Sequence, residues 1–242
     1  MTDDLAAKVL AWLQRGGYPL EYETARAFRA AGFPSEQGRN YQDPVEAGSR
    51  EADVVATLAI TASPGFDILV VAECKSLNAN PWVVLTTTTR RRQWLPIAEP
   101  TALLQTLIGP PEKYTECLAL PKRCGFSVVE AELGDREPAK GPKRDLAHDA
   151  MQQVVSAAVG IALQQSASTL ATFVMPVLVT SAPLFILSSD EPGNEQVQPA
   201  DWVRIHWHGA QAYPEPTIVD VVTRSALGQH AEDLRFDLQR LA

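Results

Sequence analysis

The chain has 242 residues, of which 45% are hydrophobic and 21% are charged, and its formal net charge is −8. Apolar residues in this proportion, spread along the whole chain, exclude a largely disordered protein and allow one sizeable core. The negative charge argues against a protein that coats nucleic acid with its whole surface. We therefore expect a single folded domain over residues 1–242.

No part of the sequence predicts export or a membrane span. The chain starts with the acidic segment Met1-Thr2-Asp3-Asp4, where a secretion signal would be basic. The longest apolar run, over residues 170–178, is too short to cross a bilayer. An odd, sparse set of cysteines without zinc-knuckle spacing fits a reducing compartment, namely Cys74, Cys117 and Cys124. A cytoplasmic protein without a membrane partner is expected.

Two helices are predicted at the start of the chain. Apolar residues at helical spacing favour a helix over residues 4–14, and a pair of glycines ends it. A second helix should begin at Pro19, which suits a first helical turn, and should end at Gly32. Glu21 lies near the beginning of this second helix.

Three strands are expected to follow. The segments 36–42 and 50–60 have strand character and are separated by a turn through Asp43-Pro44, so they predict a hairpin. The near-continuous apolar run over residues 66–74 predicts a central strand that is buried on both faces. This strand ends in the triplet Glu73-Cys74-Lys75.

The remaining chain predicts further strands and two helices. Residues 82–85 favour a short strand and residues 86–100 a loop, while residues 110–143 predict one short helix and a strand near 126–132. Beyond them the pattern predicts a helix at 145–165, strands at 172–180, 184–188, 202–207 and 217–222, and a closing helix at 230–241. The predicted fold class is α/β, with a mixed central sheet flanked by helices.

Charged side chains gather on two neighbouring predicted strands. Residues two apart on a strand share a face, so Asp53 pairs with Glu51, and Glu73 pairs with Lys75. If the strands are hairpin partners, Asp53, Glu73 and Lys75 converge at one end. Such a cluster beside a buried strand is costly unless something binds there. A divalent cation, Mg²⁺ or Mn²⁺, is the expected ligand.

This set of groups suits metal-assisted hydrolysis of a phosphodiester. The cation would hold a phosphate oxygen, lower the pKa of a bound water and neutralise charge in the transition state. The Lys75 ammonium would orient the attacking water and stabilise developing negative charge. Glu21, from the helix beside the sheet, would hold a metal-bound water or a second ion.

The order of these elements resembles the PD-(D/E)xK nuclease superfamily, which includes the restriction endonucleases. The resemblance rests on Gly17-Tyr18-Pro19-Leu20-Glu21, on Tyr41 with Asp43, on Arg50-Glu51-Ala52-Asp53-Val54-Val55 and on Val71-Ala72-Glu73-Cys74-Lys75-Ser76. These segments cover about the first third of the chain. The resemblance implies a restriction-endonuclease-like core that the C-terminal strands and helix extend.

The resemblance also implies a role for each residue of the cluster. Asp53 and Glu73 would be metal ligands, and the Cys74 carbonyl would be a third. Lys75 would be the catalytic cation, and Glu21 the helix carboxylate.

The chain departs from the superfamily pattern in two places. Ala52 stands where the motif has its proline, a change that the superfamily tolerates. The long helix carries Gln152 and Gln153 but no tyrosine four residues on, which argues against the RecB-type exonuclease branch.

Simpler interpretations of the same residues stay open at this point. Glu73 and Lys75 could form a salt bridge at a solvated strand end. Glu21 could serve only to favour the first turn of its helix, and Glu23 competes with it for the role of helix carboxylate. Glu51 is exposed to solvent, paired with Arg50, or close enough to reach the cation.

Nucleic acid is the expected partner, with DNA favoured over RNA. A basic rim around the cleft could contact phosphates through Arg90, Arg91, Arg92, Lys122, Arg123, Lys140, Lys143 and Arg144. The second half of the chain could provide a homodimer surface, because two strand breaks need two active sites. The alternative function is a catalytically inactive nuclease-fold module for binding or assembly in bacterial defence or DNA repair, which the acidic charge favours and the intact cluster opposes.

Overall fold

The computed structural model of the chain describes residues 2–61, 65–76, 80–88, 94–100, 118, 123–131, 133, 145–166, 168, 170–189, 193–208 and 210–241. The helices in these ranges are α1 (Thr2–Arg15), α2 (Tyr18–Ala30), α5 (Leu146–Gln164) and α6 (Leu227–Gln239), with a 3-10 turn at Arg224–Ala226. The strands are β1 (Ser35–Gln42), β2 (Ser49–Ile60), β3 (Phe66–Lys75), β4 (Trp82–Thr88), β5 (Ile97–Glu99), β6 (Arg123–Glu130), β7 (Ala171–Thr180), β8 (Leu184–Ser189), β9 (Glu195–Pro199), β10 (Trp202–Trp207) and β11 (Thr217–Thr223).

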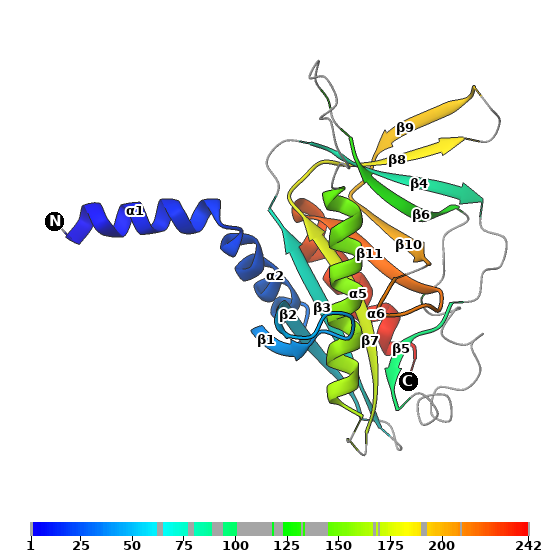
Figure 1. The fold of residues 1–242 in the computed structure, drawn as a ribbon, viewed down its shortest axis with the longest axis horizontal. Coiled ribbons are helices and arrows are strands. Elements are labelled where there is room, and N and C mark those ends of the chain that lie inside the picture. Colours follow the sequence, from blue (N-terminus) through cyan, green and yellow to red (C-terminus); the bar gives the residue numbers. More distant parts are fainter. Residues whose placement is uncertain are drawn as a thin grey trace.

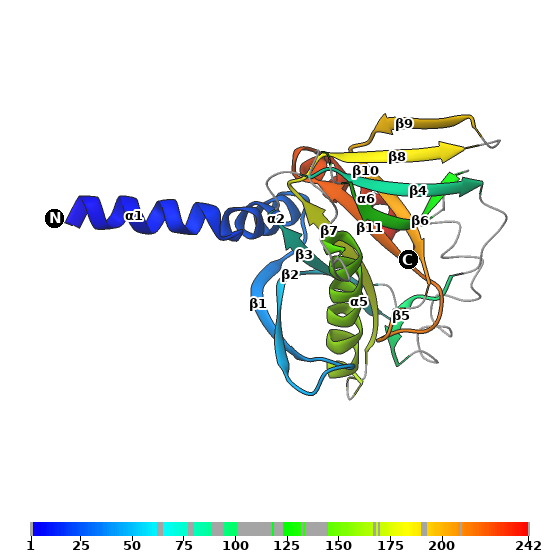
Figure 2. The same cartoon turned by 45° about the horizontal axis from the view of Figure 1, so that its top comes forward.

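The described strands form one mixed sheet of 11 strands in the order β1-β2-β3-β7-β11-β10-β6-β4-β8-β9, and β5 pairs with β7 beside this path (Figure 1). Helix α5 packs on one face of the sheet, and α2 and α6 pack on the other (Figure 2). The predicted α/β class with a mixed sheet flanked by helices is therefore confirmed.

Helix α1 contacts α2 and extends away from this body (Figure 2). The described helices include none with the length and apolar character needed to cross a membrane.

Strand β3 lies between β2 and β7 and is buried on both faces, as its sequence predicts. It pairs antiparallel with β2, which meets the condition for the convergence of Asp53, Glu73 and Lys75, and it pairs parallel with β7. Ile68 and Val70 pack in the core beneath α2 and α6, whereas Leu69 and Val71 pack beneath α5. A strand covered on both faces needs an apolar side chain at every position, which explains the uninterrupted run.

Three parallel strands end at the same edge of the sheet. The register pairs Lys75 of β3 with Thr180 of β7, and Thr180 with Thr223 of β11, so the last residues of the three strands lie side by side. The carboxyl ends of parallel strands are where open α/β sheets place their ligands. The polar end of β3 lies at this edge.

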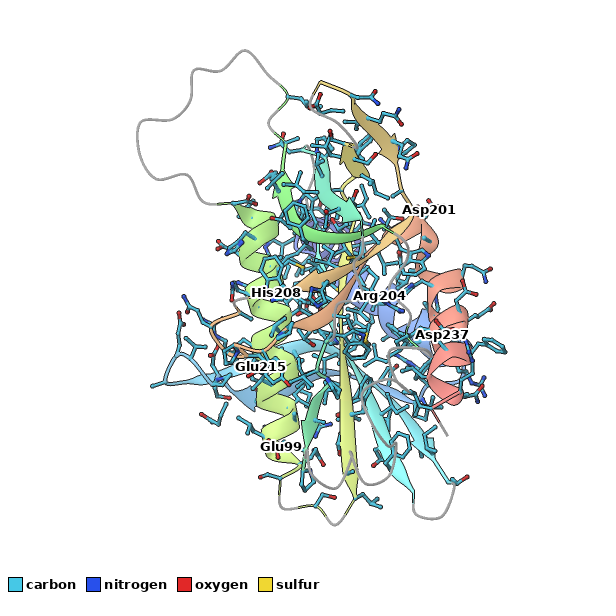
Figure 3. All side chains as sticks on the ribbon, turned by 90° about the vertical axis from the view of Figure 1, so that its right-hand side faces the viewer. Glu99, Asp201, Arg204, His208, Glu215 and Asp237 are labelled. Carbon is cyan, nitrogen blue, oxygen red and sulfur yellow. The ribbon has the colours of Figure 1, made fainter. Side chains whose placement is uncertain are left out.

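A buried ion pair joins β10 and β11 beneath α6. Arg204 donates two hydrogen bonds to Asp220, at 2.7 and 2.8 Å, and both side chains are almost fully buried. Figure 3 shows Arg204 between β10 and the helix that carries Asp237. Two parallel bonds between planar groups offset the cost of taking both charges out of water.

Some predicted elements differ from the structure. Residues 86–100 are not a continuous loop, because β4 continues to Thr88 and β5 pairs with β7; residues 89–93 lie outside the described part. A three-residue strand such as β5 is too short to show alternation in the sequence. All five residues of strand β9 are exposed, so it lacks a buried apolar face, and the sequence pattern does not predict it. The closing helix begins at Leu227 instead of residue 230. The short helix expected within 110–143 falls on residues outside the described ranges.

Gly160 of α5 is a point of close contact with the hairpin formed by β1 and β2. A Cβ added there would lie 2.6 Å from the Gln42 carbonyl oxygen and would overlap the Tyr41 ring. We predict that Gly160→Ala lowers the free energy of unfolding by about 1–3 kcal/mol, because an overpacked core is strained by this amount. Urea denaturation would measure the change.

The matched control for this substitution is Gly228→Ala in α6. Nothing lies within 4 Å of a Cβ added at Gly228, so this variant should keep or slightly raise the stability of the protein. Equal losses in the two variants would contradict the close approach of hairpin and helix.

Candidate functional site

The ladder between β2 and β3 ends next to the predicted cluster. Its pairs run from Ile60↔Phe66 to Val54↔Ala72, although both strands continue beyond that point. There the Asp53 carboxylate takes the place of a backbone acceptor, because its Oδ2 accepts a hydrogen bond from the Cys74 N–H at 2.6 Å. This bond holds Asp53 beside the end of β3.

The Cys74 carbonyl points to the same side as Asp53. The Lys75 carbonyl accepts a hydrogen bond from Ser181 N at 3.1 Å, on the side of β7. Successive residues of a strand direct their backbone groups to opposite edges, and the N–H and C=O of one residue share an edge. The N–H of Cys74 faces Asp53, so its carbonyl does too.

The Lys75 ammonium lies between two oxygen acceptors. Its Nζ donates to Glu73 Oε1 and to Gln153 Oε1 of α5, each at 2.7 Å. The side chains of Lys75 and Glu73 are 26% and 14% exposed, so the pair is not a fully solvated salt bridge. An ammonium has three donors. Two of them have partners within the described residues, which leaves one for a ligand.

Helix α2 brings Glu21 to the same end of β3. Burial raises the pKa of Glu21, and the nearby carboxylates of Glu51 and Glu73 raise it further. Glu23 is engaged elsewhere, since its carboxylate accepts a hydrogen bond from Arg224 Nε at 2.6 Å. Glu21, and not Glu23, therefore lies with the cluster at the end of β3, and Glu51 is exposed.

The cluster holds more negative charge than its cation compensates. Burial, and after it the Glu73 carboxylate, raises the pKa of Asp53 from 3.8 to about 7, against the opposing effects of the Cys74 N–H and of Lys75. Burial and the Asp53 carboxylate also raise the pKa of the Cys74 thiol well above its usual value. The thiol therefore stays protonated, and the carbonyl is the donor that Cys74 offers to a cation.

Two residues for which no role was predicted also belong to this site. Gln153 contacts Lys75, and Tyr41 of β1 is buried with a pKa raised to about 12 by burial and by Asp43 and Glu73. A signal for Gln153 exists in the sequence, because α5 is otherwise rich in buried apolar residues. Its polar residues recur at helical spacing on one face, namely Asp149, Gln152, Gln153 and Ser156.

The oxygen donors at the end of β3 fit a hard divalent cation. Asp53 and Glu73 supply carboxylates from neighbouring strands, and the Cys74 carbonyl points to the side of Asp53. Within the described ranges, no three His, Cys, Asp or Glu side chains are grouped closely enough to form a ligand set by themselves. Mg²⁺ is usually held by one or two carboxylates and keeps several waters, so two carboxylates and a carbonyl suffice for it.

The side chains of the predicted basic rim lie outside the described part of the chain, namely Arg90, Arg91, Arg92, Lys122, Lys140, Lys143 and Arg144, and for Arg123 only the backbone is described. Cys117 also lies outside them, while Cys124 of β6 is a buried free thiol.

No protein-family model, curated protein or solved structure matches this chain.

The raised pKa of Asp53 predicts a pH dependence of stability without added metal. Between pH 4 and pH 7 folded Asp53 keeps a proton that the unfolded chain has lost, so its contribution to stability is present at low pH and is lost as the pH rises to about 7. Asp53→Asn does not titrate. We predict that the free energy of unfolding of the variant rises relative to that of the wild type by about 1 kcal/mol for each pH unit over this range. Urea denaturation in EDTA at a series of pH values would measure both free energies. If they change with pH in parallel, the raised pKa of Asp53 is contradicted.

Metal binding at this site should stabilise the folded protein. A ligand that binds the folded state alone raises the melting temperature as its concentration rises. We predict that millimolar Mg²⁺ or Mn²⁺ raises the Tm of the wild type and has a much smaller effect on Asp53→Asn and Glu73→Gln. Glu195→Gln, an exposed position in β9, is the control and should respond like the wild type. An equal response in all four proteins would contradict the site.

Proposed function

We propose that this protein is a metal-dependent nuclease of the PD-(D/E)xK superfamily that hydrolyses phosphodiester bonds of DNA. The proposal is carried by the convergence of a helix carboxylate, two strand carboxylates and an ammonium at one end of β3, namely Glu21, Asp53, Glu73 and Lys75. The order of these residues along the chain supports it, because it resembles that of the superfamily. A buried cluster with unbalanced charge is a frequent property of functional sites.

Lys75 would act on the scissile phosphate. Glu73 and Gln153 hold its ammonium from two sides, which fixes the direction of the remaining N–H. A positively charged donor placed in advance stabilises the charge that develops on the phosphate oxygens. Gln153 would therefore be a positioning residue, because it acts through Lys75.

Glu21 would act as a general base. A carboxylate is a better base when its pKa is raised towards neutrality, and burial together with its acidic neighbours has this effect on Glu21. Asp53, Glu73 and the Cys74 carbonyl would hold the cation. Bound Mg²⁺ or Mn²⁺ would supply a Lewis acid for the phosphate and lower the pKa of a water.

The charge and the cysteines are compatible with further parts of the proposal. A net charge of −8 argues against binding of nucleic acid through the whole surface, but local contacts with a few phosphates need only a few basic side chains. The described free thiols, Cys74 and Cys124, are compatible with the reducing cytoplasm. A homodimer would supply two active sites for cleavage of both strands.

Cleavage assays test the proposal directly. We predict that the protein cuts supercoiled plasmid or single-stranded DNA with Mg²⁺ or Mn²⁺, and that Asp53→Asn, Glu73→Gln and Lys75→Met each lower the rate by about 100-fold or more. Glu21→Gln should also lower the rate, because it removes the proposed base. Gel electrophoresis of time courses would measure the rates.

The matched controls lie close in sequence or share the side-chain type. Glu23→Gln is in the same helix as Glu21 but is bound to Arg224, and Lys8→Ala removes an exposed lysine paired with Asp4. Both should retain wild-type rates. Absence of cleavage with any divalent metal, or activity that survives both Asp53→Asn and Lys75→Met, would instead favour the inactive binding or assembly module.

A further inference from the structure

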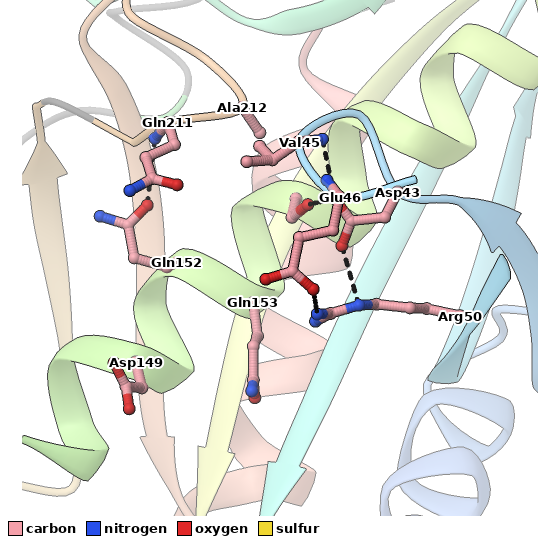
Figure 4. Close-up of a pocket in the computed structure, with 10 residues that line it drawn as sticks. Asp43, Val45, Glu46, Arg50, Asp149, Gln152, Gln153, Gln211 and Ala212 are labelled. Atoms are coloured by element: carbon pink, nitrogen blue, oxygen red, sulfur yellow. Dashed lines mark hydrogen bonds and ion pairs between the residues drawn. The ribbon is translucent and has the colours of Figure 1, made fainter. Parts of the chain in front are cut away.

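A polar pocket lies beside the candidate site (Figure 4). Three segments form it: the hairpin formed by β1 and β2, helix α5, and the loop that follows β10. Gln153 lines this pocket, and its Oε1 also accepts a hydrogen bond from Lys75 Nζ at 2.7 Å. The pocket and the proposed catalytic ammonium therefore share one side chain, so a ligand in the pocket would lie next to the reacting phosphate.

The α5 wall of the pocket is polar and held in place. Gln152 Oε1 accepts a hydrogen bond from the Gln211 N–H at 3.1 Å, and Ser156 Oγ donates to Asp43 Oδ1 at 3.1 Å. These bonds restrict the side chains before any ligand arrives, which lowers the entropic cost of binding. The wall consists of one face of the helix, formed by Asp149, Gln152, Gln153 and Ser156.

The charge of the lining disfavours phosphate as the ligand. Three carboxylates line the pocket against one guanidinium, that of Arg50, and this guanidinium already binds Asp43 at 2.9 Å and Glu46 as well. An anion would be repelled, whereas a ligand that presents N–H groups would find carboxylate oxygens to accept them.

The size of the pocket suits a single aromatic ring. Its volume is about 170 Å³, and a cavity of about 150 Å³ in a protein core is enough to hold benzene. Val45 and Ala212 add apolar contacts to the polar lining. A flat ring with hydrogen-bonding groups on its edge matches this combination of surfaces.

We propose that this pocket is a subsite for an unpaired nucleobase with an exocyclic amino group, and that cytosine fits it best. The proposal rests on the proposed nuclease function and adds the base that lies beside the scissile phosphate. Aspartate and glutamate accept hydrogen bonds from the cytosine amine, and the amide N–H groups of glutamine can donate to acceptors on a base edge. Thymine presents a carbonyl oxygen in place of the amine, which a carboxylate repels. The base must leave its duplex to enter a pocket, so the substrate is single-stranded or locally opened DNA or RNA.

Mapping of cleavage sites tests the subsite. Random-sequence single-stranded oligonucleotides, deoxyribo and ribo in separate arms, would be cut with Mn²⁺ and the bases flanking each cut sequenced. We expect cytosine to be enriched by about tenfold over thymine at one flanking position, as one specific base contact provides. Asp149→Asn and Gln152→Leu should each reduce this enrichment. Asp233→Asn, on the exposed face of α6 and bonded to Gln229, is the control and should keep it.

A second measurement separates this proposal from the nuclease itself. Fluorescence anisotropy in EDTA would compare binding of oligonucleotides that carry cytosine or thymine, by the wild type and by Asp149→Asn, with circular dichroism to check folding. Base-dependent binding that the substitution removes supports the subsite even if no metal yields cleavage. Cleavage without preference for an amino-bearing base, or a preference that survives both pocket substitutions, overturns it while the nuclease proposal stands.

Discussion

The burial of β3 on both faces is the constraint on which the rest of this structure depends. The strand lies between β2 and β7, and its side chains alternate between the core beneath α5 and the core beneath α2 and α6. Such a strand can carry charge only where its helical cover ends. The polar triplet Glu73-Cys74-Lys75 stands at that end, where both layers of helices can still reach it.

The cluster at the end of β3 follows from this geometry. Asp53 replaces a backbone acceptor of the ladder, and it is thereby held in a partly buried place next to a second carboxylate. The structure tolerates this because Lys75 and the Cys74 N–H compensate part of the charge. A bound divalent cation would neutralise the remaining excess of negative charge, and this requirement connects the fold to the proposed chemistry.

Helix α5 has two roles, one of which needs apolar side chains and the other polar ones. One side of it is apolar and packs on the sheet, whereas the other carries the polar residues that line the pocket and hold Lys75. Gly160 allows the β1–β2 hairpin to approach this helix closely, so that Asp43 reaches Ser156. Packing at the far end of the helix thus shapes the pocket next to the candidate site, and it couples the stability of the hairpin to the proposed recognition of a base.

The sequence by itself determined the elements of the first third of the chain and the residues of the cluster. The reason is local: the apolar run of β3, the hairpin turn and the helix ends are encoded by neighbouring residues, and strand periodicity sets which side chains share a face. Only the tertiary structure placed Glu21 beside the cluster and Glu23 beside Arg224, brought Gln153 to Lys75 and formed the pocket. These contacts join segments that are distant in the chain, and β5 and β9 became strands through partners that no local pattern reveals.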